Sequence, residues 1–181
     1  MAFDRVLAVG VICLLASLAQ SANARPSENI RSCPASAPTE GIFSAAKIYK
    51  NAVVAVEEGD EVSPIHIALY RSNGNSCKKT IIARYSHEGA DPKVDSVFFG
   101  KINGQENLFT IVRWEVNHRG IGTYGNLYQV YAYKRVAETL VENDAITKNG
   151  YMTGLDGYQD GSPVIFPYKT AASVKKFFKI K

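Results

Sequence analysis

A glycine-rich segment at residues 117–128 separates two strongly patterned stretches of the sequence. It contains the literal pattern G-x-G-x-x-G, from Gly120 to Gly125. In a dinucleotide-binding site that pattern follows a strand and opens a helix, so that phosphate meets the helix N-terminus. Here an aromatic strand pattern follows instead, so we expect a connection between strands whose glycines supply positive φ. This connection is either a flexible connector or a binding loop, and under the binding-loop hypothesis its side chains suited to recognition are His118, Arg119, Tyr124 and Tyr128.

Three short motifs bear on nucleophilic catalysis. SAAK at 44–47 matches S-x-x-K, YGN at 124–126 matches Y-x-N, and KTA at 169–171 approaches K-T-G. Their order resembles that of the penicillin-recognising serine hydrolases. The resemblance implies that Lys47 lowers the proton affinity of Ser44 and that the third motif lines the substrate strand. The third motif ends in Ala171 rather than glycine, and the chain is short for that family's two-part α/β fold, so this hypothesis stays a remote alternative.

Metal-ligating residue types are present without metal-site spacing. The histidines, His66, His87 and His118, lie 21 and 31 residues apart, and no H-x-x-x-H pair occurs. The stretch DGYQDG at 156–161 has the composition of a calcium loop. It lacks the D-x-[DN]-x-[DN]-G spacing and the closing glutamate, so we interpret it as a cluster of turns. We therefore expect neither a metal site nor a cofactor.

Aromatic residues are dense in the two stretches that flank the glycines. With the period of two that strands impose, Tyr131 and Tyr133 share one face and Tyr128 lies on the other. Trp114 shares its face with apolar residues at 108, 112 and 116, which predicts a core position. We expect at least one tyrosine face to be partly exposed. Tyrosine suits protein interfaces and glycan stacking alike.

The N-terminus reads as an export signal. The apolar run from Val6 to Leu18 has 13 residues, whereas a membrane-spanning helix needs roughly 20. ANA at 22–24 matches an A-x-A cleavage site, and a polar stretch begins at Arg25. The sequence predicts a cleaved signal peptide over residues 1–24 and a protein that is periplasmic or secreted. The absence of any N-x-S/T sequon favours a bacterial periplasm.

Cleavage would leave two cysteines, Cys33 and Cys77. Exported proteins usually pair such cysteines, so we predict a disulfide. Closing a loop of about 45 residues would stabilise the fold by about 4 kcal/mol in the chain-entropy model.

Charge is concentrated at the C-terminus. Residues 25–168 hold 15 Lys and Arg against 16 Asp and Glu, and five lysines follow from Lys169 to the end. A near-neutral body is not the electrostatic footprint of a nucleic-acid-binding protein. The final segment alternates lysines with apolar residues and predicts a short helix over 171–178 that docks by its apolar face.

Period-two patterning and turn signals dominate the chain after a Pro- and Ser-rich arm at 25–41. Strand patterns recur from residue 52 to 136, with Asn103-Gly104 as a hairpin turn. The apolar pair at 140–141 is predicted to extend the last strand. The stretch 148–167 is rich in Gly, Asp and Pro and is predicted to be loop, while 42–50 is open between helix and strand. The expected fold is mainly β, an antiparallel sandwich or a curled, barrel-like open sheet with a short C-terminal helix, in one domain over 42–181.

No catalytic set emerges from these motifs. The sequence therefore predicts an exported, non-catalytic binding protein, an inhibitor or immunity protein against an enzyme that attacks the cell envelope. Its partner would be a protein such as a toxin or cell-wall hydrolase, with no nucleic acid and no membrane span. A peptidoglycan- or glycan-binding module is the alternative, and the serine hydrolase is the remote one.

Overall fold

A computed structural model describes residues 33, 41–73 and 76–180 of the chain. The predicted signal peptide, residues 1–24, lies outside the described residues, and so does the predicted arm apart from Cys33 and Gly41. These predictions, and the assignment of 42–181 to one domain, stay predictions.

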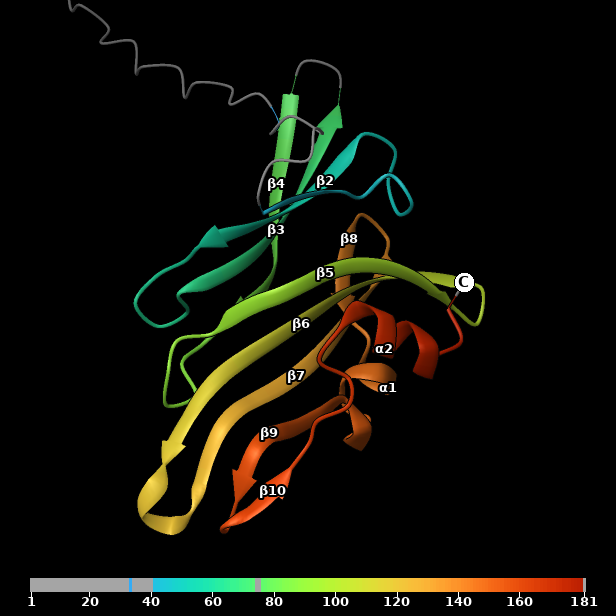
Figure 1. The fold of residues 1–181 in the computed structure, drawn as a ribbon. Coiled ribbons are helices and arrows are strands. Elements are labelled where there is room, and N and C mark those ends of the chain that lie inside the picture. Colours follow the sequence, from blue (N-terminus) through green and yellow to red (C-terminus); the bar gives the residue numbers. More distant parts are fainter. Residues whose placement is uncertain (1–32, 34–40, 74–75, 181) are drawn as a thin grey trace, which may run out of the picture.

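The first sheet is an antiparallel meander of four strands, at the upper end of the molecule in Figure 1. Its strands are adjacent in the order of the sequence: β1 (Ile42–Ser44), β2 (Ala52–Glu58), β3 (Ile65–Asn73) and β4 (Ser76–Tyr85). Cys77 of β4 forms a disulfide with Cys33, and their Cα atoms are 5.2 Å apart. The predicted disulfide is thus confirmed. The ambiguous segment 42–50 is the short strand β1 followed by turns.

The second sheet is built around a long hairpin of two 14-residue strands, β6 (Gln105–His118) and β7 (Thr123–Val136). The free side of β6 pairs with β5 (Lys93–Ile102) through the predicted Asn103-Gly104 turn. The other side of β7 is shared by two short strands, β8 (Thr139–Glu142) near its C-terminal end and β9 (Thr153–Gln159) near its N-terminal end. The last strand, β10 (Ser162–Val164), pairs with β9.

Two short helices and two 3-10 turns complete the described chain: η1 (Arg119–Ile121), α1 (Asp144–Thr147), η2 (Gly150–Met152) and α2 (Ala171–Phe177). Helix α1 fills the gap between β8 and β9, where the amide of Ala132 in β7 donates to Thr147 Oγ1 over 3.1 Å. Helix α2 begins with a capping box, in which Thr170 and Ser173 exchange side-chain and backbone hydrogen bonds. The predicted C-terminal helix is therefore present.

The second sheet buries both of its faces. One face packs against the first sheet through a cluster that includes Val54, Ile67, Leu108, Trp114 and Tyr133. The opposite face packs against α1, η2, α2 and the segment before α2. The alternation of Leu108, Val112 and Trp114 predicted this first core correctly. The structure confirms the mainly β fold, with two antiparallel sheets, one of them curled, and a short helix near the C-terminus.

Three buried hydroxyl groups join the two sheets. Tyr85 of β4 is hydrogen-bonded to Thr110 of β6 over 2.6 Å and to Tyr133 of β7 over 2.8 Å. Burial raises the pKa values of Tyr85 and Tyr133 well above the ordinary tyrosine value. Burial also raises the pKa of Tyr131, whose ring packs against that of Tyr85, to about 12. All three phenols are therefore neutral in the folded protein near pH 7.

The prediction of a loop over 148–167 is wrong, because the segment contains η2, β9 and β10. Gly157 in β9 lies opposite Gly125 in β7, with φ values of 154° and 139°. A Cβ atom on either glycine would come within 2.3 Å of a carbonyl oxygen on the other strand. These glycines let two strands approach closely. A glycine-rich composition is also typical of loops, which is why the sequence predicted a loop here. The pair at 140–141 is likewise not an extension of the preceding strand, since the chain turns at 137–138 and β8 pairs back on β7.

Candidate functional site

The tip of the long hairpin is shorter and more ordered than the predicted binding loop. Strand β6 continues to His118 and β7 starts at Thr123, so only residues 119–122 connect them. Gly122 adopts a left-handed conformation with φ of 71°, and its amide donates to the carbonyl of Arg119 over 3.0 Å. Gly120 and Gly122 connect two strands, as predicted, but they belong to a tight 3-10 turn rather than a long loop, and Gly125 lies within β7.

A second hairpin, β9–β10, fixes this turn from the side. The amide of Gly161 donates to the carbonyl of Gly122 over 3.0 Å, and the amide of Asp160 donates to Thr123 Oγ1 over 3.2 Å. A Cβ atom on Gly122 would come within 2.6 Å of the Gly161 nitrogen, so only glycine fits there. The two turns form a single projecting end, seen at the bottom of Figure 1, which we call the tip.

Three side chains stack at the tip. The rings of Tyr124 and Tyr158, which are register partners on β7 and β9, lie 4.8 Å apart with 18° between their planes. The Arg119 guanidinium carbon lies 4.5 Å from the Tyr124 ring centre. Arg119 Nε also donates to Asn117 Oδ1 over 3.1 Å. Because β6 and β9 flank β7, Arg119 and Tyr158 approach Tyr124 from opposite sides. We call Arg119, Tyr124 and Tyr158 the tip stack.

The tip also exposes apolar surface. Ile121, at the end of the 3-10 turn, is 67% exposed, and Tyr158 is 40% exposed. A branched aliphatic side chain, two tyrosines and an arginine therefore share one rigid end of the molecule. Aromatic residues and arginine are enriched in protein interfaces relative to the rest of protein surfaces.

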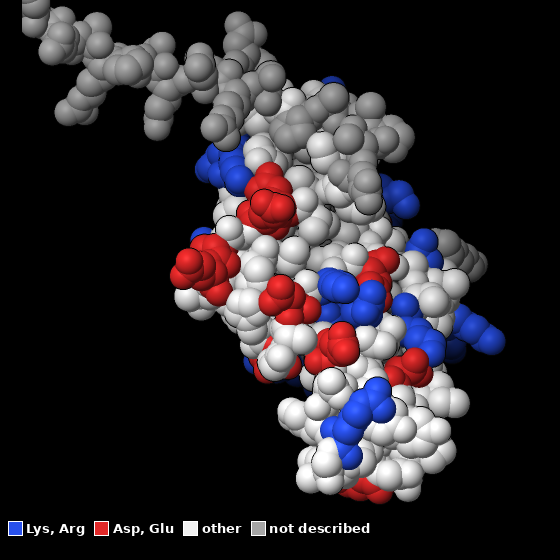
Figure 2. Space-filling model, turned by 60° about the vertical axis from the view of Figure 1, so that its left-hand side comes forward, with Lys and Arg blue, Asp and Glu red and all other residues white. Residues whose placement is uncertain are grey.

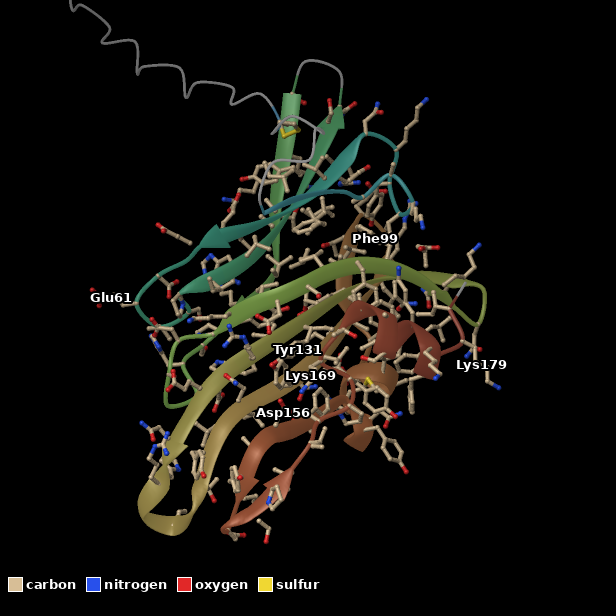
Figure 3. All side chains as sticks on the ribbon, viewed as in Figure 1. Glu61, Phe99, Tyr131, Asp156, Lys169 and Lys179 are labelled. Atoms are coloured by element: carbon tan, nitrogen blue, oxygen red, sulfur yellow. A yellow bond between two sulfur atoms is a disulfide. The ribbon has the colours of Figure 1, made fainter. Side chains whose placement is uncertain are left out.

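Pairs of oppositely charged side chains lie on the helix-covered face of the second sheet, between the helices and the tip. Arg113 Nε donates to Asp95 over 2.8 Å, and its Nη1 donates to Asn126 over 3.2 Å. Lys169 Nζ lies 2.7 Å from Asp156 Oδ2, an arrangement that Figure 3 shows, and this hydrogen bond raises the pKa of Lys169. Blue and red atoms accordingly lie close to one another across the face in Figure 2. Since the pairs neutralise each other, this region contributes polar contacts without a strong net field.

Asp95 reaches this face because of a β-bulge. The register between β5 and β6 shifts between Val94 and Ser96, which leaves Asp95 as the extra residue. Bulges re-aim a side chain that regular alternation would place elsewhere. No turn residue or motif marks this position, so the Asp95–Arg113 pair could not be predicted from the sequence.

The structure separates the four residues predicted for the binding loop. Arg119 and Tyr124 lie together in the tip stack, and His118 is exposed at the end of β6. Tyr128 is only 8% exposed, and its ring stacks on Phe166 at 5.6 Å within the core beneath the helices. Tyr128 is therefore not among the exposed side chains of the tip. Sequence reasoning also missed Ile121 and Tyr158.

The three hydrolase-like motifs lie on separate elements. Ser44 ends the strand β1 and is followed by turns, so Lys47 is not placed one helical turn from Ser44. Tyr124 lies in the tip stack, Lys169 is paired with Asp156, and Thr170 caps α2. None of the hydrogen bonds or ion pairs among the described residues joins one motif to another.

The described residues include neither a metal-binding cluster nor a membrane-spanning helix. Among residues 33, 41–73 and 76–180, no group of three His, Cys, Asp or Glu side chains is close enough to hold a metal ion. Within the same residues, no helix has both the length and the apolar character needed to cross a membrane.

Comparisons with known proteins match this chain to no protein-family model, no curated protein and no solved structure. The functional argument therefore rests on the residues of the tip and their geometry.

Proposed function

We propose that this chain is an exported, non-catalytic binding protein that recognises a protein partner through its tip. In this proposal it acts as an inhibitor or immunity protein against an enzyme that attacks the cell envelope. The observation that carries the proposal is the exposed tip stack of Arg119, Tyr124 and Tyr158 beside Ile121, fixed by hydrogen bonds between two turns.

The geometry of the tip stack favours a protein partner over a glycan. Sugar rings bind tyrosine by lying on a free ring face. Both faces of Tyr124 are covered, one by Arg119 and the other by Tyr158, so it presents its edge and hydroxyl group. Edge and hydroxyl contacts, together with an arginine and an exposed isoleucine, are typical of interface hot spots.

Rigidity supports the role of an inhibitor. The tip is cross-linked by the Gly161–Gly122 and Asp160–Thr123 hydrogen bonds, so it loses little conformational entropy when it binds. It also projects beyond the helices, as Figure 1 shows, so it can enter a concave surface such as an enzyme cleft. Protease inhibitors show that interfaces built on preformed elements can bind very tightly.

The disulfide supports export. Structural disulfides persist in oxidising compartments, and Cys33–Cys77 is such a bond. Together with the predicted signal peptide over 1–24, it favours a periplasmic or secreted location for the mature protein. N-terminal sequencing of protein from its native compartment tests this part of the proposal, and we expect a mature N-terminus at Arg25.

The proposal is tested by capture from periplasmic extract. The mature protein is immobilised beside the double variant Arg119→Ala/Tyr124→Ala and beside Arg84→Ala, a matched change at an exposed arginine of β4. We expect mass spectrometry to identify a protein that wild type and Arg84→Ala retain and the double variant loses. That protein should be a cell-wall hydrolase or toxin whose activity falls when wild type is added.

The same samples test the glycan alternative. Sedimentation with purified peptidoglycan should show no binding by the wild-type protein. Co-sedimentation that disappears in Arg119→Ala/Tyr124→Ala would contradict the proposal and favour a peptidoglycan-binding module.

A further inference from the structure

A second candidate site lies at the other end of β7, on a surface that the proposed function does not use. A cavity of about 590 Å³ opens between the first sheet and the turn after β7. Four basic residues line it, Lys50, Arg71, Lys78 and Arg135, against one acidic residue, Glu138. At the 3.3 Å rise of a strand residue, the 14 residues of β7 place it about 40 Å from the tip.

The two arginines are held in place by one tyrosine. The guanidinium carbons of Arg135 and Arg71 lie 4.3 and 5.0 Å from the centre of the Tyr49 ring. Tyr49 is buried, and its hydroxyl group donates to the carbonyl of Thr139 over 2.9 Å. Because burial and this hydrogen bond fix the Tyr49 side chain, the two guanidinium groups are held close together in the absence of a ligand.

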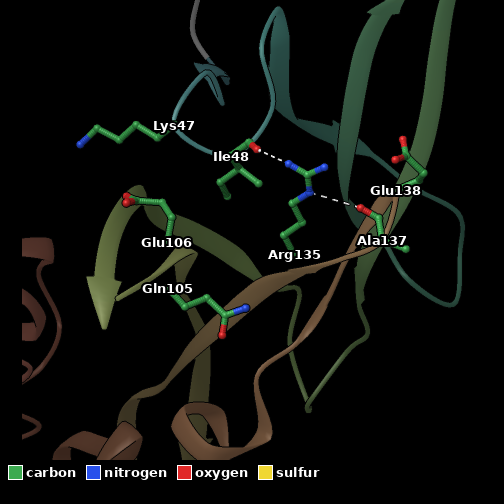
Figure 4. A pocket seen from close by; sticks show the side chains of 7 residues that line it. All are labelled: Lys47, Ile48, Gln105, Glu106, Arg135, Ala137 and Glu138. Atoms are coloured by element: carbon green, nitrogen blue, oxygen red, sulfur yellow. Dashed lines mark hydrogen bonds between the residues drawn. The ribbon is translucent and has the colours of Figure 1, made fainter. Parts of the chain in front are cut away.

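Arg135 is fixed further by the backbone. Its Nη1 donates to the carbonyl of Ile48 over 3.3 Å and its Nε to the carbonyl of Ala137 over 3.2 Å, the two dashed lines in Figure 4. A guanidinium group has five N–H donors, so these bonds leave donors free for a ligand.

The positive charge of the cavity is not balanced by the described residues that line it. Glu138 is paired with Arg71 alone, and its side chain is 71% exposed. The hydrogen bond from Arg71 holds the pKa of Glu138 below the ordinary glutamate value. Arg71 Nε is buried and has no hydrogen-bond partner among the described residues. An unpaired buried N–H donor next to excess positive charge is stabilised by an acceptor that carries negative charge.

A neighbouring cavity shows that this imbalance is local. It shares Arg135 and Glu138 with the first and is lined in addition by Lys47 and Glu106, as Figure 4 shows. Two basic and two acidic residues balance there. The surplus of cations is therefore confined to the side of Arg135 that holds Tyr49, Arg71 and Lys78.

We propose that the cavity around Tyr49, Arg71 and Arg135 binds a small polyvalent oxyanion, a ligand that carries phosphate or carboxylate groups. The fork of a guanidinium matches both kinds of group through paired N–H···O bonds. Lys50 and Lys78 add long-range attraction at the rim. In the unliganded protein Glu138 occupies part of the site and competes with the ligand for Arg71.

Calorimetric titration of the folded, disulfide-bonded protein tests this proposal, with pyrophosphate in one arm and citrate in the other at matched ionic strength. The main variant is Lys50→Gln/Lys78→Gln, which removes two exposed charges that make no described ion pair. Its matched control is Lys93→Gln/Lys101→Gln, the same change at two exposed lysines of β5. We expect the cavity variant to weaken binding at least tenfold and the control to stay within twofold of wild type.

Glu138→Gln is expected to change the affinity for the anion in the opposite direction. Removing the competing carboxylate should tighten binding several-fold, whereas a purely structural role for Glu138 would weaken it.

The arm with the higher affinity identifies phosphate or carboxylate as the preferred group. Absence of binding in both arms, equal loss in the cavity variant and the β5 control, or weaker binding by Glu138→Gln would overturn the proposal. Arg119→Ala/Tyr124→Ala should bind the anion like wild type, so failure here is distinguishable from failure of the tip proposal.

Discussion

Strand β7 contributes tyrosines to two stacks, and these stacks have opposite surroundings. Tyr85, Tyr131 and Tyr133 lie between the two sheets, and we call them the inner stack. The rings of Tyr131 and Tyr133 are stacked at 6.5 Å, and the Tyr85 ring lies 4.9 Å from Tyr131 at a tilt of 34°. Tyr124 and Tyr158 stack at 4.8 Å at the tip, where Tyr158 is 40% exposed and Arg119 lies over Tyr124.

The difference lies in what covers each stack. Two sheets enclose the inner stack, where the hydroxyl group of Tyr85 is hydrogen-bonded to those of Thr110 and Tyr133 and burial raises the tyrosine pKa values. The tip stack lies beyond the helices, as Figure 1 shows, and Tyr158 and Arg119 are exposed there. Stacking geometry alone therefore does not distinguish a structural tyrosine from a candidate binding tyrosine, and exposure has to be considered as well. The inner stack stabilises the fold, and we assign recognition to the tip stack.

The sharpest test of this comparison removes one ring from each stack. Tyr133→Ala deletes a buried ring and leaves Tyr85 with one hydroxyl partner fewer, so we expect a loss of about 3–5 kcal/mol in the free energy of unfolding. Tyr158→Ala should cost less than about 1 kcal/mol, because its ring is partly exposed. Urea denaturation measures both values, and equal losses would contradict the division between the two stacks.

A smaller loss of stability is expected when the close pairing of β7 and β9 is disturbed. This pairing places Tyr158 beside Tyr124. Gly125→Ala puts a Cβ atom 2.3 Å from the Asp156 carbonyl oxygen at a φ of 139°. We expect a loss of about 2 kcal/mol from this strain. Gly120→Ala is the matched control, because a Cβ atom there meets no other atom within 4 Å. Thermal denaturation should separate the two variants, and equal stability would show that β9 does not pack this closely on β7.

Alkaline titration should divide the tyrosines by their surroundings. The folded pKa of Tyr131 is about 12, above the value near 10 of an unfolded chain. A raised folded pKa means that the stability from the neutral phenol is fully present below about pH 10 and is lost as pH rises further. We expect the ultraviolet signal of tyrosinate to appear in two stages, the second accompanied by unfolding. A single stage near pH 10 with native circular dichroism would contradict the burial of the inner stack.

Much of the fold could be predicted because the alternation of apolar residues along a strand and the residue types of a turn are local features of the sequence. The pattern of Leu108, Val112 and Trp114 identified the face that packs on the first sheet, and Asn103-Gly104 identified a hairpin. Strands β9 and β10 could not be predicted in this way. Glycines that permit close strand contact, as at 125 and 157, look the same in sequence as glycines that form a turn.

The candidate site was only partly predictable for the same reason. Arg119 and Tyr124 were identified because they lie together in one glycine-rich segment. Tyr158 lies 34 residues beyond Tyr124, and only the register of β7 with β9 brings the two together. The burial of Tyr128 could not be predicted, because Phe166, which stacks on it, comes from a segment predicted to be loop.

The central claim is that the tip, and not the inner stack, binds a protein partner. Its most direct test is the affinity of Arg119→Ala/Tyr124→Ala for the partner captured with the wild-type protein, measured by calorimetry beside the melting temperature. We predict binding about 30-fold weaker or more, as truncation of interface hot spots implies, with a nearly unaltered melting temperature. Unchanged affinity would contradict the claim, and a large fall in melting temperature would show that these two side chains belong to the fold instead.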